Sequence, residues 1–156
     1  MNPENINTLD ALVASHTKDL GRRAILVMSD CSATPALATI ISGHLASIGV
    51  RHGYISLDRT AEAVADSFKR FGFSQNLDLI ELWEPIEAVS NIRIQEVVES
   101  RRWNAVIIDN INILGRLCQE NQCDLCLMLD RLARSAGVPV FCIANKPHET
   151  VDGSGK

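Results

Sequence analysis

Residues 103–109, Trp-Asn-Ala-Val-Ile-Ile-Asp, decide the fold, because they form an apolar run that ends in a carboxylate. A short, continuous apolar run of this kind is typical of a strand that is buried on both faces of a sheet. Four other stretches also predict strands: Ala24–Met28, His52–Leu57, Leu77–Leu82 and Val138–Ala144. We therefore expect a central sheet of about five strands.

The stretches between these strands carry apolar residues at helical spacing. The predicted helices cover Pro35–Leu45, Thr60–Phe71, about 92–100 and about 124–136. Helix-sized crossovers between apolar strands predict a mainly parallel sheet with helices on both faces. The expected fold class is thus α/β, with three layers in the order α/β/α.

Composition predicts one compact domain. The chain has 156 residues, 46% of them hydrophobic, with a formal net charge of −4. We expect a single domain over 1–149 that starts with a lead-in helix over 1–20, and a flexible C-terminal tail over 150–156. The acidic balance argues against a dedicated nucleic-acid coat, and the aromatic content of 4% argues against a base-stacking platform.

The two basic pairs, Arg22-Arg23 and Arg101-Arg102, precede predicted strands. They are expected to be solvated strand starts, with a small basic patch as the alternative. We expect Trp83 and Trp103 to pack in the core or at an interface rather than to stack on bases.

Targeting and cysteine content predict a cytoplasmic location. The first ten residues are polar and acidic, unlike a signal peptide, and no apolar run approaches the length of a membrane span. Five cysteines, one of them Cys142 in a predicted strand, suit a reducing compartment. Cys123 and Cys126 form a C-x-x-C spacing, which is open to a redox pair, half a zinc site with Cys118, or two helix-face thiols. We favour the last.

Ligands of such sheets bind beyond the carboxyl ends of the strands. Four polar segments follow the predicted strands there: Ser29–Pro35, Asp58-Arg59, Asp109-Asn110 and Asn145–His148. Asp109 and Asp58 are therefore candidate site residues, although each also has the position of a helix or loop cap.

Several of these stretches resemble the RecA-like ATPase core found in bacterial replicative helicases, circadian-clock ATPases and RadA-type recombination ATPases. Ile48–Asp58 and the helix after it are similar to the family's second strand and helix, and Val106–Asp109 is similar to the Walker B strand. Val138–Asn145 resembles the next strand, and Ile6–Leu12 resembles the segment before the phosphate loop. The resemblance implies a RecA-like P-loop topology. It also implies that Asp109 would order Mg²⁺ and that Asp58 would activate water.

The phosphate loop departs from the family pattern. A Walker A loop, G-x-x-x-x-G-K-[ST], needs glycines that curl its amides around phosphates, a lysine for the β- and γ-phosphates and a hydroxyl for Mg²⁺. In this chain Ser29 and Thr34 take the places of the glycines, Pro35 that of the lysine and Ala36 that of the hydroxyl residue. The residues between them are Asp30, Cys31, Ser32 and Ala33, and no glycine occurs between Gly21 and Gly43. Pro35 also removes a backbone amide, so we expect a vestigial loop that binds no nucleotide cofactor and no metal.

These observations predict a non-catalytic pseudo-ATPase. Such a chain would act through a protein partner, or by self-association through RecA-like packing faces, without a membrane and with only indirect contact to nucleic acid. The resemblance alone places it in a DNA recombination, replication or related regulatory assembly. The alternative is an atypical ATPase that binds Mg·ATP through the amides of Ser29–Ala33, with Asp109 on Mg²⁺ and Asp58 as general base.

A second fold is also considered. Asp30, Asp109 and Lys146-Pro147 are similar to the acidic residues and Lys-Pro of response-regulator receiver domains. In receivers, however, the phospho-accepting Asp ends the third strand, whereas Asp109 ends the fourth predicted strand. We therefore favour the RecA-like interpretation.

Overall fold

The structure is a computed structural model that describes residues 22–29, 34–84, 91–118 and 122–145. Strands and helices alternate along the chain, as the sequence pattern predicts. The elements are β1 (Ala24–Ser29), α2 (Thr34–Ser47), β2 (His52–Ser56), α3 (Ala61–Arg70), η1 (Leu77–Leu79), β3 (Ile80–Trp83), α4 (Asn91–Ser100), β4 (Ala105–Asp109), α5 (Ile111–Cys118), α6 (Gln122–Ala136) and β5 (Val140–Asn145).

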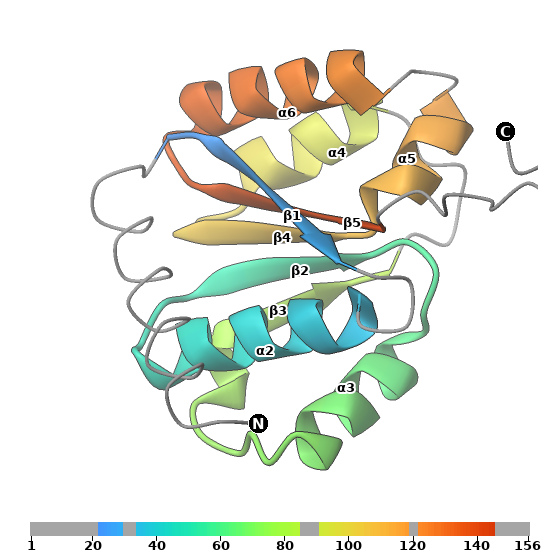
Figure 1. Ribbon diagram of the computed structural model, residues 1–156. Helices are drawn as coiled ribbons and strands as arrows, with labels where there is room; N and C mark the ends of the chain where they lie inside the picture. Colours follow the sequence, from blue (N-terminus) through green and yellow to red (C-terminus); the bar gives the residue numbers. More distant parts are fainter. Residues whose placement is uncertain (1–21, 30–33, 85–90, 119–121, 146–156) are drawn as a thin grey trace, which may run out of the picture.

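The five strands form one parallel sheet in the order β1-β5-β4-β2-β3. Helices α2 and α3 cover one face of the sheet, and α4, α5 and α6 cover the other (Figure 1). This is the three-layer α/β/α architecture predicted from the sequence. No helix within the described residues is long and apolar enough to cross a membrane.

Strand β4 explains why its sequence is apolar at consecutive positions. Val106 and Ile108 pack into the cluster beneath α4, α5 and α6, whereas Ala105 and Ile107 pack into the cluster on the α2–α3 side. All four side chains are 0% exposed. Because side chains alternate across a strand, a strand covered on both faces must be apolar throughout.

The structure corrects the prediction in two places. Leu77–Leu79, expected to start a strand, forms the 3₁₀ helix η1, and β3 begins only at Ile80. Ile111–Cys118 forms a helix that the sequence analysis did not predict. The glycine inside it, Gly115, lowers helix propensity and obscures the pattern, but Ile111 and Leu114 lie on one buried face and anchor the helix.

The strand order excludes the receiver alternative. Receiver domains have the order 2-1-3-4-5, which places the first strand inside the sheet. Here β1 is an edge strand beside β5. Asp109 therefore ends a strand that is separated from β1 by β5, whereas the third strand of a receiver lies beside its first.

Two buried contacts hold the start of β2. His52 is fully buried, donates through Nδ1 to the carbonyl of Val50 (2.9 Å) and accepts through Nε2 from Ser42 Oγ (2.6 Å), which fixes the neutral imidazole. Desolvation by burial lowers the pKa of His52 to about 4, despite the opposing hydrogen bond to Val50.

The residue after His52, Gly53, lies against the ring of Trp103. A Cβ added at Gly53 would meet ring carbon Cε3 at 2.3 Å. Trp103 is thus a core residue, as expected.

Candidate functional site

The candidate site lies where β2 and β4 end. The parallel register pairs Ser56 with Asp109, so the end of β2 and the loop that follows it adjoin the Asp109 carboxylate. Tyr54, two residues before Ser56, points to the same face of the sheet. Tyr54 is 0% exposed and Asp109 2% exposed, so this carboxylate is buried.

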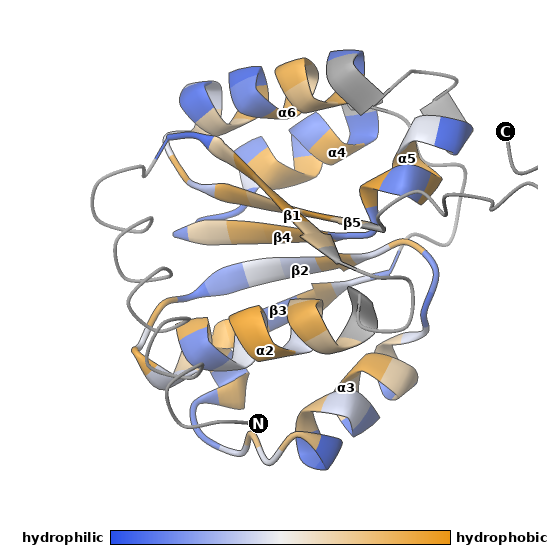
Figure 2. Cartoon of the chain, in the orientation of Figure 1, coloured by the Kyte–Doolittle hydropathy of each residue, from blue (hydrophilic) through white to orange (hydrophobic). Residues whose placement is uncertain are grey.

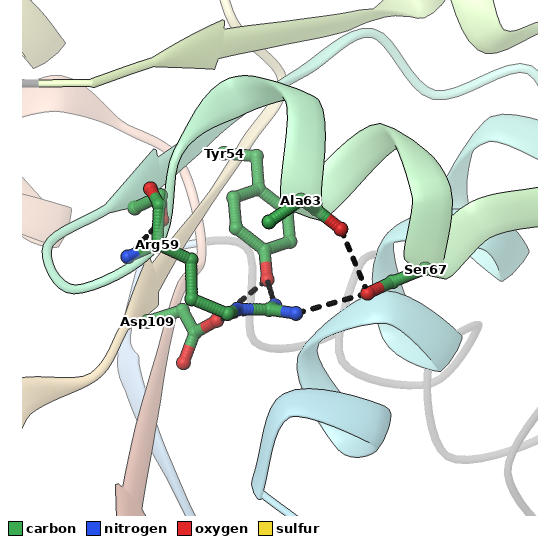
Figure 3. Close-up of polar contacts among 6 residues, drawn as sticks. Tyr54, Arg59, Ala63, Ser67 and Asp109 are labelled. Atoms are coloured by element: carbon green, nitrogen blue, oxygen red, sulfur yellow. Dashed lines mark hydrogen bonds and ion pairs between the residues drawn. The ribbon is translucent and has the colours of Figure 1, made fainter.

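Two side chains hold the Asp109 carboxylate (Figure 3). The Tyr54 hydroxyl donates to Asp109 Oδ2 at 2.6 Å, and Arg59 Nη2 donates to the same oxygen at 2.9 Å. Arg59 Nη2 also donates to the Tyr54 hydroxyl at 2.7 Å. Asp109, Tyr54 and Arg59 therefore form a closed triangle, which we call the Asp109 triad.

The loop after β2 fixes the position of Arg59. Ser56 Oγ donates to the carbonyl of Arg59 at 2.7 Å and accepts from its amide at 3.3 Å. Further along the side chain, Arg59 Nη1 donates to Ser67 Oγ at 3.0 Å, and Ser67 in turn donates to the carbonyl of Ala63 on α3. The arginine thus connects β2, β4 and α3. Among the described residues its buried Nε atom has no partner.

The electrostatics of the triad favour a neutral tyrosine beside a charged pair. Desolvation, followed by the charge of Asp109, raises the pKa of Tyr54, so the phenol keeps its proton and acts as the donor. Burial alone would lower the pKa of Arg59, but its interactions with Tyr54 and Asp109 raise it. The guanidinium is therefore a permanent cation next to Asp109.

This arrangement does not fit a magnesium ion. The side chain that the resemblance assigns to Mg²⁺, Asp109, already accepts hydrogen bonds from a guanidinium and a phenol on one oxygen. A divalent cation there would face the positive charge of Arg59, which is 17% exposed and held within the protein. Among the described residues, no group of three or more His, Cys, Asp or Glu is placed to hold a metal ion.

Asp58 lies at the rim of the triad and is exposed. Partial desolvation, followed by repulsion from Asp109, raises the pKa of Asp58 above its usual value, although Arg59 opposes this shift. The cap interpretation of Asp58 is wrong, because Thr60 is the N-cap of α3 and accepts from the amide of Ala63 at 3.1 Å.

Asp109 is not a cap either. The residue that caps α5 is Asn110, whose Oδ1 accepts from the amide of Asn112 at 2.8 Å and from that of Ile113 at 3.4 Å. The cap interpretation of Asp109 is therefore wrong, because the capping residue is the next one along the chain. It fails because the register with β2 turns the Asp109 side chain toward Tyr54 and Arg59.

Only part of the predicted vestigial phosphate loop lies within the described residues. Ser29 ends β1, and α2 begins at Thr34, so Pro35 and Ala36 occupy its first turn. This is the position where a proline is tolerated in a helix. Asp30, Cys31, Ser32 and Ala33 lie outside the described residues, so the state of the loop remains a prediction.

The remaining candidate residues have structural surroundings where they are described. Arg23 forms an ion pair with Asp130 (3.1 Å), and Arg101 with Glu81 (2.8 Å), so one member of each basic pair is neutralised. Cys126 packs against the core, whereas the side chains of Cys118 and Cys123 lie outside the described part. Lys146–His148 also lies outside it.

Sequence reasoning identified Asp109 and missed its two partners. Arg59 was noted only as part of a polar segment, and Tyr54 was not a candidate. The available indication was the spacing in His52–Ser56, which puts Tyr54 and Ser56 on one face and the Asp58-Arg59 turn directly after them. That indication becomes specific only when β4 is known to pair with β2.

Comparisons with known proteins support the fold alone. No protein-family profile matches the sequence, and no curated protein matches it. The flagellar accessory protein FlaH from Methanocaldococcus jannaschii matches with a TM-score of 0.62, 14% identity and 84% of this chain covered. A KaiC-like protein from Pyrococcus horikoshii matches with a TM-score of 0.64, 15% identity and 83% covered. The chain spans 66% and 63% of the length of those two proteins, less than two thirds of each. This protein has the α/β fold of RecA-like P-loop ATPases.

Proposed function

We propose that this chain is a non-catalytic protein with a RecA-like fold, a pseudo-ATPase that acts by binding other proteins. The observation that carries this proposal is the Asp109 triad. The carboxylate that would order Mg²⁺ in an active relative is buried and already bound by Arg59 and Tyr54. Because the Arg59 guanidinium already neutralises the Asp109 carboxylate, no metal ion is needed to balance its charge.

The sequence around α2 supports the same proposal. Proline and alanine stand where the phosphate-binding lysine and the magnesium-binding hydroxyl would be needed. The losses at this loop and the triad at Asp109 affect two different parts of the ATPase machinery. Both oppose binding of Mg·ATP.

A thermal shift assay with saturating Mg·ATP tests whether the chain binds nucleotide, which is the non-catalytic half of the proposal. A ligand that binds only the folded state stabilises it by about 2.7 kcal/mol at a hundredfold over its dissociation constant. We expect no change in melting temperature. A clear rise would contradict the proposal, and loss of that rise in Asp109→Asn but not in an exposed control, Asp78→Asn, would assign binding to the triad.

One observation favours the alternative, an atypical ATPase. Asp58 is exposed beside the triad and has a raised pKa, which suits a general base. Steady-state phosphate release measured with wild type and Asp58→Asn decides between the two. Activity that disappears in Asp58→Asn would establish the enzyme, whereas we expect none in either protein.

The protein-binding half of the proposal rests on the fold. RecA-like subunits pack side by side, and a subunit without phosphate chemistry retains those packing faces. On the resemblance alone, we propose that this contact belongs to a DNA recombination, replication or related regulatory assembly. Tagged chain purified from its native cells should carry a stoichiometric protein partner or a second copy, and recovery only as a monomer would contradict this half.

A further inference from the structure

The free edge of the sheet at β1 has no role in the Asp109 triad. Strand β1 pairs with β5 from Ala24 with Val140 through Ser29 with Asn145. Within the parts of the chain that the structure describes, no strand pairs with the other side of β1. At the start of this edge the amide of Ala24 donates to Asp130 on α6, and the outward N–H and C=O groups of Leu26 and Met28 are open to another strand.

Apolar side chains are exposed along the same edge. Leu26 is 44% exposed and Met28 46% exposed, and their alternate spacing puts both on one face. Their partners on β5, Cys142 and Ala144, are 1% and 0% exposed and belong to the core beneath α5 and α6. The apolar face of the sheet thus continues from β5 onto β1, where it is only partly covered. Figure 2 shows β1 in hydrophobic colours along this edge.

The β1 edge lacks the features that usually prevent strand addition. Natural edge strands carry charges or prolines that block pairing with another chain. Ala24–Ser29 contains neither, whereas the opposite edge strand, β3, carries Glu81. A strand that is added to β1 would therefore meet no buried charge.

We propose that this edge pairs with β1 of a second copy of the chain, antiparallel about a two-fold axis at Val27. In that register Leu26 lies opposite Met28 of the second copy, and Met28 lies opposite its Leu26. Directly opposite residues share a face, so the exposed side chains of both copies gather into one apolar cluster. Such a pairing is isologous and closes as a dimer.

Charge at the strand start is compatible with this geometry. Antiparallel pairing places the Arg23 residues of the two copies at opposite ends of the joined strands. Each Arg23 is also held by Asp130, which further accepts from the amide of Ala24 at 3.0 Å. No like charges meet at the axis. The strands are short, so we expect a weak dimer that depends on concentration.

This inference rests on the proposed function in one respect: it names a surface for the protein contact. The two can fail separately. Nucleotide binding concerns the Asp109 triad, and the dimer concerns β1.

Sedimentation velocity of the whole chain over a range of concentrations tests the dimer. We expect a monomer–dimer equilibrium for wild type. The double variant Leu26→Lys, Met28→Lys sets like charges against each other and should weaken the dimer by about tenfold or more. The matched control Leu127→Lys, at a side chain 59% exposed on α6, should dimerise like wild type.

Hydrogen exchange of wild type keeps the proposal testable even if the double variant fails to fold. On raising the concentration, amide protection should increase in β1 and stay constant in β3. A chain that is monomeric at every concentration would overturn the proposal. So would a dimer that survives the double substitution, or protection that increases at β3 instead.

Discussion

The inner strands and the β1 edge distribute polarity in opposite ways. In the middle of the sheet β2 and β4 bury polar groups, including Tyr54, Asp109 and His52, and each of these groups has a partner. At the edge β1 leaves Leu26 and Met28 nearly half exposed, at 44% and 46%. Burying a polar group destabilises a protein unless the group is hydrogen-bonded, whereas covering an exposed apolar group lowers the free energy. The interior strands therefore have their polar groups satisfied within the chain, whereas the β1 edge is suited to contact with another chain.

The largest expected effect tests the buried pair of Arg59 and Asp109. Asp109→Asn leaves the Arg59 guanidinium without its ionised partner, and breaking a buried pair in this way costs about 3–5 kcal/mol. Urea denaturation measures the loss in the free energy of unfolding. The control Asp58→Asn removes an exposed carboxylate from the loop that carries Arg59 and should change stability by about 0.5 kcal/mol or less. Equal effects of the two variants would show that the triad is not a stabilising pair.

The next effect concerns the packing of β2. Gly53→Ala forces a Cβ into the Trp103 ring, which is 5% exposed and donates to Glu81 Oε2 at 2.8 Å, and it should cost about 3 kcal/mol. Trp103→Leu removes the ring, so the double variant should lose less than the sum of the two single variants. Full additivity in denaturant titrations would contradict the contact.

A pH-dependent effect tests His52. Its pKa is about 4 in the folded state and 6.5 when unperturbed, so between these values the unfolded chain binds more protons. Stability should therefore fall as the pH drops from about 6.5 to about 4, by up to about 3 kcal/mol, and this contribution should level off below pH 4. His52→Gln keeps a partner for Ser42 and cannot titrate. If its pH profile matched that of wild type over this range, His52 would not be the cause.

The smallest effect belongs to the edge. Leu26→Lys removes an apolar side chain that is already 44% exposed, so the monomer should lose less than about 1 kcal/mol. Thermal denaturation at low concentration measures this loss. A loss as large as that of Asp109→Asn would mean that β1 is covered within the monomer and that the contrast does not hold.

The fold was largely predictable because its cause is local. Apolar runs such as Val106–Ile108 and helical spacing between them indicate strands, crossovers and a parallel sheet without knowledge of any contact. The helix at Ile111 was missed because Gly115 obscures its pattern and its cap, Asn110, stands next to a more conspicuous aspartate.

The candidate site was only half predictable. The strand end at Asp109 follows from sequence, but its chemistry depends on Arg59, which is separated from it by 50 positions along the chain. Only the pairing of β2 with β4 brings the two together, and no local pattern encodes that pairing. For the same reason the exposure of Leu26 was not foreseen, since edge and interior strands differ in neighbours rather than in their own sequence.

Arg59 also makes the positive charge beside Asp109 independent of the concentration of any ligand. The occupancy of a site by a metal ion or a nucleotide depends on the concentration of that ligand, whereas a side chain of the same chain is present at every ligand concentration. In the pseudo-ATPase that we propose, the corner formed by β2, β4 and α3 should therefore keep one shape whether ATP is abundant or exhausted. In the assembly that we propose, such a subunit would keep its shape while ATP-hydrolysing members change theirs.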